Sequence, residues 1–211
     1  MNIVSCGKKE IEKVYFEWHL TNWCNFKCSY CSVLHSITND FTKPDHTALH
    51  NLTLRRLSNV EKLFNICLTG GEPTIHPDIL HILEFLQNID NCEDISMFTN
   101  LSRPTAWFEK LSAFRHDKLT LFASYHPEYE NKNFYEKCVA LQNANYCRFS
   151  VHVSLHDKVE YWDKTLQFMD SIKTLGINCK PLLLAKTKSY TPNYSSKFYD
   201  IFLPYLESSG E

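Results

Sequence analysis

The chain has 211 residues, 44% of them hydrophobic, and a formal net charge of −2. This length and apolar content suffice for a sizeable core, and no Pro/Gly/Ser-rich linker divides the sequence, so we predict a single domain over residues 1–211. The balanced charge gives no strong signal for nucleic-acid binding. No stretch approaches the roughly 18 apolar residues of a membrane span.

The N-terminus and the cysteine content both bear on the cellular compartment. The sequence "MNIVSCGKKEIEKVYFEW" lacks the long apolar core of a secretory signal peptide. Nine cysteines in a chain of this size do not fit a small secreted disulfide scaffold, and the odd number also argues against one. We therefore predict a cytoplasmic protein, in which clustered thiols usually serve metal or redox chemistry.

Strand patterns and helix patterns alternate along the chain. Short β-branched and aromatic runs indicate the strands, and apolar residues three or four positions apart indicate the helices. In chain order we predict a strand at 14–20, a helix at 47–64, a strand at 65–69, a helix at 76–89, a strand at 94–100, a helix at 103–114, a strand at 118–126, a helix at 133–144, a strand at 146–156, a helix at 158–176, a strand at 177–185 and a last helical piece at 195–207 that is broken by Pro204.

Six strands alternating with helices predict parallel βα units and hence an α/β fold. Eight such units close a full barrel of roughly 250 residues, so six units predict an open, partial (β/α)6 barrel. Its core would span about residues 14–185, followed by a C-terminal helical extension at about 186–211. The polar motifs fall at the carboxyl ends of the strands, where active sites of parallel α/β proteins assemble.

The run "TNWCNFKCSYC" follows the first strand and contains Cys24, Cys28 and Cys31. Thiolates bind chiefly zinc and iron–sulfur clusters. A structural zinc site takes four protein ligands, and the nearest completion here is His35, which would give a Cys3His site. Three cysteines can instead hold three irons of a 4Fe–4S cluster and leave the fourth iron open, as a catalytic metal site requires.

The Cys-x3-Cys-x2-Cys spacing, with Tyr30 before the last cysteine and "GGEP" at 70–73 after the second strand, resembles the radical S-adenosylmethionine (radical SAM) superfamily. The resemblance runs from about residue 14 to 185. It implies a 4Fe–4S cluster on the three cysteines and S-adenosyl-L-methionine on the open iron. Reductive cleavage of that cofactor would give a 5′-deoxyadenosyl radical that abstracts hydrogen from a substrate. It also implies an electron donor such as flavodoxin or ferredoxin.

The "GGEP" motif matches the family's glycine pair and its neighbours. Without Cβ atoms, Gly70 and Gly71 would let the backbone approach the methionine moiety closely. Glu72 would accept a charge-assisted hydrogen bond from the methionine ammonium group. Pro73 would fix the turn that leads away from the strand.

Further cofactor contacts are implied at four polar or aromatic positions. Tyr30 matches the aromatic residue near adenine, although a packing role is the alternative. Thr99, Asn100 and Ser124 lie at strand ends, where the resemblance implies contacts with the methionine carboxylate or the ribose hydroxyls. Polar residues at such positions are also common turn formers.

Two histidines are candidate catalytic residues. His126, in "SYHPEY", is expected to bind cofactor or substrate or to act as an acid or base, with a hydrogen-bonded turn histidine as the alternative. In "VHVSLHD", the two-residue period places His152, Ser154 and His156 on one face of the strand. A polar face is costly in a sealed core, so we expect it to line a cavity, with His152 as a catalytic residue and Ser154 as a cofactor contact.

The remaining cysteines and the substrate are less informative. No paired ligand spacing links Cys6, Cys67, Cys92, Cys138, Cys147 and Cys179. The substrate remains open among a small metabolite, a nucleotide, a sugar and a peptide. The alternative function is a zinc-stabilised binding protein without catalysis, built on the Cys3His set.

Overall fold

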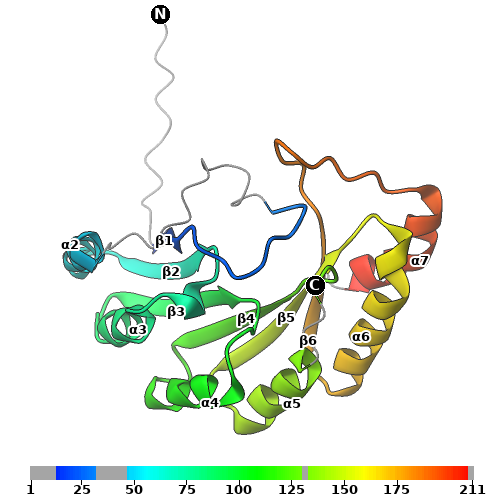
Figure 1. Cartoon of the computed structure of the whole chain (residues 1–211). Helices are drawn as coiled ribbons and strands as arrows, with labels where there is room; N and C mark the ends of the chain where they lie inside the picture. The colour runs from blue at the N-terminus through cyan, green and yellow to red at the C-terminus, as the bar shows by residue number, and fades with distance from the viewer. Residues whose placement is uncertain (1–12, 32–46, 130–132, 209–211) are drawn as a thin grey trace, which may run out of the picture.

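The structure, a computed structural model, describes residues 13–31, 47–129 and 133–208 (Figure 1). Six parallel strands form one sheet in the order β1-β2-β3-β4-β5-β6. The strands are β1 Lys13–Thr21, β2 Leu63–Gly70, β3 Cys92–Thr99, β4 Leu119–Tyr125, β5 Arg148–Leu155 and β6 Asn178–Leu183. The α-helices are α2 Thr47–Ser58, α3 Ile79–Gln87, α4 Thr105–Phe108, α5 Phe134–Ala144, α6 Trp162–Thr174 and α7 Ser196–Ser208, and the 3-10 helices are η1 Pro73–Ile75, η2 Glu109–Ala113 and η3 Val159–Tyr161.

This sheet confirms the predicted open, parallel α/β architecture. The helices cover its outer face, and the segments that follow β1 and β6 lie together above the carboxyl ends of the strands (Figure 1). None of the helices in the described ranges is long and apolar enough to cross a membrane. Because every strand is parallel to its neighbours, all six carboxyl ends meet at one edge.

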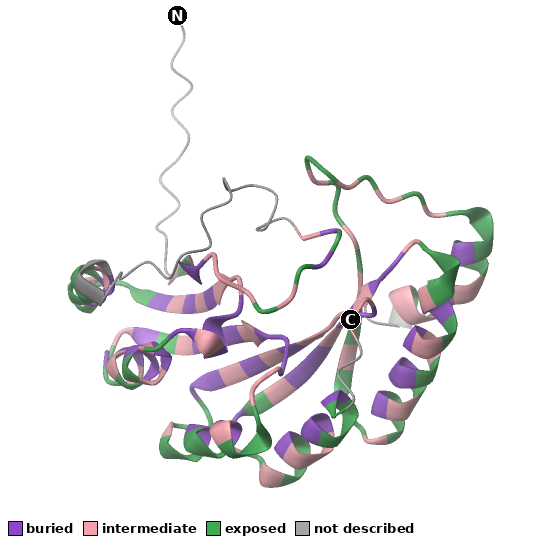
Figure 2. Ribbon diagram, viewed as in Figure 1, coloured by how far each residue is buried: buried purple, intermediate pink, exposed green. Residues whose placement is uncertain are grey.

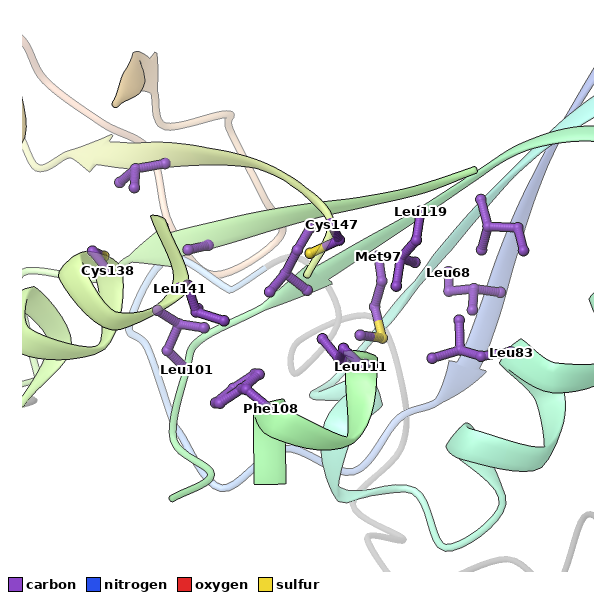
Figure 3. Packing of buried hydrophobic residues seen from close by; sticks show 14 of the residues in the cluster. Leu68, Leu83, Met97, Leu101, Phe108, Leu111, Leu119, Cys138, Leu141 and Cys147 are labelled. Atoms are coloured by element: carbon purple, nitrogen blue, oxygen red, sulfur yellow. The ribbon is translucent and has the colours of Figure 1, made fainter. Parts of the chain in front are cut away.

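The core lies between the outer face of the sheet and the helices. Buried and half-buried residues alternate along the central strands (Figure 2), as the two-residue period of a strand requires. Leu68, Met97 and Leu119 come from neighbouring strands and face Leu83 and Leu111 of the helical layer (Figure 3). The opposite face of the sheet is left free for polar groups and for a cavity.

The predicted helix at 47–64 is too long at its C-terminal end. Helix α2 ends at Ser58, and Leu63 already belongs to β2. Phe64 is fully buried and pairs with Val14 of β1. The spacing of Phe64 from the preceding leucines also fits a helix, but its burial between the sheet and the helices favours the strand conformation.

The predicted helix at 103–114 is a short α-helix that continues as a 3-10 helix. Helix α4 covers Thr105–Phe108, and η2 follows at Glu109–Ala113. Phe108 and Leu111 are both buried, with relative exposures of 1% and 0%. The tighter 3-10 winding aligns residues three positions apart, which brings these two side chains onto the same buried side.

The predicted break at Pro204 is wrong. Helix α7 runs through Pro204 to Ser208. Phe198 and Phe202, one helical turn apart, are buried and both lie edge-on to Trp162 of α6. This aromatic packing offsets the hydrogen bond that a proline removes from a helix interior.

Candidate cluster and cofactor site

A cavity of about 330 Å³ lies at the carboxyl ends of the strands. It brings together all the predicted site residues except His152. These lining residues are Cys24, Cys28, Tyr30, Cys31, Gly70, Gly71, Glu72, Pro73, Thr99, Asn100, Ser124, His126 and Ser154. The volume is in the range of small-ligand pockets.

The cavity also has a wall that the sequence analysis missed. Phe98, on β3, lines the cavity, as do residues 182–185 at and beyond the end of β6 and Thr187 beyond them. Phe98 lies two positions before Asn100, so strand alternation could have identified it. The segment after β6 carries no motif, and only the tertiary structure brings it to the cysteines.

The three cysteines of the loop after β1 carry no disulfide. The loop is tightened by a hydrogen bond from the Cys31 N–H to the Cys28 carbonyl, at 3.1 Å. Burial raises the pKa of Cys24 to about 11 and that of Cys28 to about 12. These two thiols are therefore neutral at pH 7 without metal, and metal binding must release their protons.

A single metal ion and an iron–sulfur cluster place their cysteine sulfurs differently. Within the described part of the chain, the only His, Cys, Asp or Glu group with three ligand atoms within 4.8 Å of one another is His50, His76 and Asp78. The three sulfurs of the cysteine loop form no such group. A single tetrahedral zinc, with bonds of about 2.3 Å, holds its sulfurs roughly 4 Å apart. In an iron–sulfur cluster each thiolate binds its own iron, so the three sulfurs need not meet around one ion. The proposed fourth zinc ligand, His35, lies outside the described residues.

The two glycines of "GGEP" are required by the protein's own backbone. A Cβ atom at Gly71 would lie 2.0 Å from the carbonyl oxygen of Trp23, and one at Gly70, where φ is +129°, would lie 2.3 Å from that of Thr21. The Gly71 N–H donates to the Thr21 carbonyl at 2.6 Å. The turn after β2 is thus packed directly against the start of the cysteine loop, and only glycine permits this approach.

Glu72 is buried, with a relative exposure of 1%. Its Oε1 accepts hydrogen bonds from the Thr74 N–H at 3.1 Å, the Thr74 hydroxyl at 2.6 Å and the Thr99 hydroxyl at 2.8 Å. Its Oε2 accepts the Asn100 N–H at 2.6 Å. Burial raises the pKa of Glu72, and these four bonds oppose the shift. The carboxylate therefore links the ends of β2 and β3, and only Oε2 keeps capacity for a ligand ammonium group.

Tyr30 and His126 form a hydrogen-bonded pair beside the cysteines. The Tyr30 hydroxyl lies 2.9 Å from His126 Nδ1. Burial lowers the pKa of His126 to about 4 and raises that of Tyr30. At neutral pH the imidazole is therefore uncharged, and its tautomer decides which of the two groups donates.

His152 lies on the same face of the sheet as the cavity but does not line it. Its ring stacks on Phe122 at a centroid distance of 4.7 Å, and Phe122 stacks on Phe98 at 5.0 Å. Burial lowers the pKa of His152 to about 4, so the ring is neutral at pH 7. Three rings from β3, β4 and β5 thus form a layer, of which Phe98 reaches the cavity.

His156 follows β5 and is fully enclosed, with a relative exposure of 1%. Its Nε2 lies 3.2 Å from Oε1 of Glu128, and its Nδ1 lies 3.0 Å from Asp157. Strand alternation predicted that His152, Ser154 and His156 share one cavity-lining face, but of these three only Ser154 lines the cavity. His156 lies beyond the end of β5, in a polar network.

The family comparison agrees with this arrangement. The model of the Radical SAM superfamily matches residues 18–184, which include the cysteine loop and all six strand ends. The chain belongs to the Radical SAM superfamily.

Curated relatives of this radical SAM chain are similar over part of its length. A GTP 3′,8-cyclase of Haemophilus influenzae (strain PittGG) is 33% identical over 92 residues, which cover 41% of this chain and 26% of that protein. Molybdenum cofactor biosynthesis protein moc-5 of Caenorhabditis elegans is 35% identical over 92 residues, 42% of this chain and 15% of that protein. The matched region is thus about a quarter or less of these relatives.

Solved radical SAM structures share the fold over nearly the whole chain. Streptococcus suis SuiB bound to S-adenosylmethionine has a TM-score of 0.64 at 14% identity, covering 93% of this chain and 48% of that one. Native anSMEcpe with bound AdoMet has a TM-score of 0.64 at 18% identity, covering 93% and 59%. The chain therefore spans about half the length of these structures.

A second group of possible ligands lies outside the cavity. His50, His76 and Asp78 place one ligand atom each within 4.8 Å of the others. The Asp78 N–H donates to His76 Nδ1, and Asp78 is the N-cap of α3, where the helix dipole is positive. Both features oppose a cation at this place, and we assign no metal to it.

Proposed function

We propose that the protein is a radical SAM enzyme whose Cys24, Cys28 and Cys31 hold a 4Fe–4S cluster. When bound, the cluster and S-adenosyl-L-methionine supply reductive cleavage of the cofactor to a 5′-deoxyadenosyl radical, which abstracts hydrogen from the substrate. The observation that carries the proposal is the opening of all three cysteines onto one cavity that the "GGEP" turn also lines. The opening of the cysteines onto a cavity disfavours the zinc-stabilised alternative, because a structural zinc site is closed by four protein ligands.

The residues of the chain would bind the cofactor, orient it and exclude water. The turn at Gly70 and Gly71 offers backbone groups beside the cysteine loop, and Oε2 of Glu72 retains capacity for an ammonium group. Ser124 and Ser154 offer hydroxyls suited to a ribose or a carboxylate. These contacts hold the reacting group in place, which is the protein's share in cofactor chemistry.

Further parts of the cavity would complete the site. Thr99 and Pro73 shape the turn end, and the Asn100 amide lies 3.9 Å from the Cys24 sulfur, where an N–H group can tune a cluster. Apolar side chains of residues 182–185 would keep water out. Exclusion of water would also strengthen the polar contacts that hold the cofactor in the site.

The two histidines would act differently. His126 lines the cavity beside Tyr30 and can contact cofactor or substrate. His152 would act through the ring layer with Phe122, because it does not reach the cavity. Both rings are neutral at pH 7, which suits them as hydrogen-bonding groups more than as charged acids.

For the substrate and the electron donor we propose only a class of molecule, and for the location only a compartment. The named relatives include a GTP cyclase, and one solved structure shows SuiB bound to precursor peptide SuiA. A nucleotide and a peptide are therefore the first substrate classes to try, ahead of a sugar or another small metabolite. We propose a flavodoxin or ferredoxin as the electron donor, a cytoplasmic location and a single domain over residues 1–211.

The decisive experiment replaces Cys24, Cys28 and Cys31 individually by alanine under anaerobic conditions. We expect the wild-type protein to be brown, to contain about four irons and, once reduced, to form 5′-deoxyadenosine. Each variant should lose iron and cofactor cleavage. Cys67→Ala, on β2 and outside the cavity lining, is the matched control and should retain both. A colourless wild-type protein that holds zinc would contradict the cluster and favour the zinc-stabilised alternative.

A further inference from the structure

The segment that follows β4, residues 126–129, contacts the cysteine loop at several points. Tyr129 makes two of these contacts. Its ring stacks on that of Phe26 at a centroid distance of 4.1 Å and an interplanar angle of 1°, and its hydroxyl accepts the Lys27 N–H. The aromatic ring and the hydroxyl thus hold consecutive residues between the first and second cysteines.

Glu128 holds the residue between the second and third cysteines. Its Oε2 accepts the Ser29 N–H at 2.7 Å, and its other oxygen accepts the Ser29 hydroxyl. Hydrogen bonds to a carboxylate are about twice as strong as those between neutral groups. The Glu128 side chain is only 12% exposed, whereas Ser29 is exposed, so the carboxylate is shielded from water at its own end of these bonds.

Contacts from outside the loop extend along its whole length between Cys24 and Cys31. Tyr30 is bonded to His126 at 2.9 Å, and the Asn25 side chain accepts from the Asn100 amide at 3.1 Å. Every residue between Cys24 and Cys31 that is not a cysteine therefore has a partner outside the loop. These residues are Asn25, Phe26, Lys27, Ser29 and Tyr30.

Glu128 is itself fixed from the other side. Its Oε1 lies 3.2 Å from Nε2 of the buried His156, whose Nδ1 lies 3.0 Å from Asp157. Asp157 in turn accepts the hydroxyl of Tyr190 and the N–H of Asn193. The carboxylate that binds the cysteine loop thus belongs to a network that joins β4, β5 and the segment after β6.

We propose that residues 126–129 are a clamp that positions the cysteine loop for its cluster, with Glu128 as the main positioning residue and Tyr129 as the second. This inference rests on the proposed function, because it assumes a cluster on the three cysteines. A loop held in its binding shape loses less conformational entropy when the metal binds. The clamp therefore makes the loop bind the cluster more tightly and release it more slowly.

The test compares Glu128→Ala and Tyr129→Phe with the matched controls Glu136→Ala and Tyr135→Phe, both at exposed positions of α5. One measurement is the rate at which a ferrous chelator removes iron from the anaerobically reconstituted protein. The other is backbone hydrogen exchange across residues 22–31 of the metal-free protein, with β3 and β5 as internal references.

We expect Glu128→Ala to release iron about tenfold faster or more, and Tyr129→Phe to release it a few-fold faster, because charged bonds are worth more than neutral ones. Exchange at Lys27 and Ser29 should rise while β3 and β5 keep wild-type rates. Glu128→Gln retains one acceptor oxygen and should restore part of the protection, which a loss of general stability would not produce.

Wild-type rates of iron release and exchange in both Glu128→Ala and Tyr129→Phe would overturn the clamp. If Glu128→Ala does not fold, Ser29→Ala, which removes only a hydroxyl, takes its place beside Tyr129→Phe. A wild-type protein that takes up no iron would instead refute the proposed function. In that case the exchange rates at Lys27 and Ser29 still decide whether the segment holds the loop.

Discussion

The Glu72 carboxylate accepts the Thr99 hydroxyl at 2.8 Å, although the two residues are 27 positions apart in the chain. The same carboxylate accepts the N–H of Asn100, the first residue after β3. The turn after β2 is therefore tied to the end of the neighbouring strand, and any change at Glu72 acts on the protein as well as on a ligand.

Glu72→Gln should lower stability and cofactor affinity together. The substitution replaces one acceptor oxygen by an NH₂ donor in a buried site where the Glu72 carboxylate accepts from Thr74, Thr99 and Asn100. Losing a bond to a charged group costs roughly 1.5–3 kcal/mol, and we expect the free energy of unfolding to fall by about that amount. Denaturant unfolding and S-adenosylmethionine titration measure the two effects.

The control for this change is Glu84→Gln, at an exposed position of α3. It should alter neither the free energy of unfolding nor the affinity for S-adenosylmethionine. Weaker cofactor binding with wild-type stability would show that the Glu72 carboxylate serves the ligand alone. Unchanged values of both would contradict the buried network.

Gly71→Ala should be far more damaging than Gly176→Ala. The new methyl group at Gly71 would meet the Trp23 carbonyl at 2.0 Å, so the start of the cysteine loop must move. At Gly176, where φ is +67°, nothing lies within 4 Å, and only the backbone preference is lost, at about 1 kcal/mol. We expect Gly71→Ala to exceed this cost and to lose iron as well. Thermal unfolding and iron content test the pair, and equal effects at both positions would contradict the close approach.

Acidification should destabilise the metal-free protein partly through His126. Its pKa is about 4 in the folded protein against 6.5 for the ordinary side chain, because burial disfavours the charged form. Between these values the unfolded chain binds a proton that the folded protein does not, so stability falls as the pH drops from about 6.5 to 4. This group contributes at most roughly 3 kcal/mol of that loss.

His126→Asn tests this contribution, since the shorter side chain keeps a polar atom near Tyr30 but does not titrate. Unfolding free energies measured between pH 4 and 7 should vary less steeply in the variant. The metal-free protein is used so that loss of iron does not add to the slope. A slope equal to that of the wild type would place the proton uptake elsewhere.

Substitutions at Ser154 and His152 should distinguish a side chain that contacts a ligand in the cavity from one that only packs beside it. Ser154→Ala should fold normally, keep the cluster and weaken cofactor binding or turnover by about fivefold, which is the loss of one neutral hydrogen bond of roughly 1 kcal/mol. His152→Ala should lower stability by about 1 kcal/mol because it removes the ring that stacks on Phe122, whereas His152→Phe should retain it. Reduced turnover in His152→Phe at full stability would instead indicate a direct role for the imidazole.

The sequence by itself determined the architecture and most of the cavity lining. Alternating strand and helix patterns predicted six parallel units, because a strand and a helix each impose their own period on the apolar residues. The spacing of Cys24, Cys28 and Cys31 and the "GGEP" motif are equally local. Since parallel strands end at one edge, these motifs could be expected to meet there.

Only the tertiary structure decided what those residues contact. Gly71 is required by Trp23, and Ser29 is held by Glu128, which is 99 positions away. Hydrogen bonds and close approaches between distant segments depend on how the chain is folded and leave no period in the sequence. For the same reason the helix expected at 47–64 ended early at Ser58, where burial of Phe64 in the sheet outweighed the helical spacing.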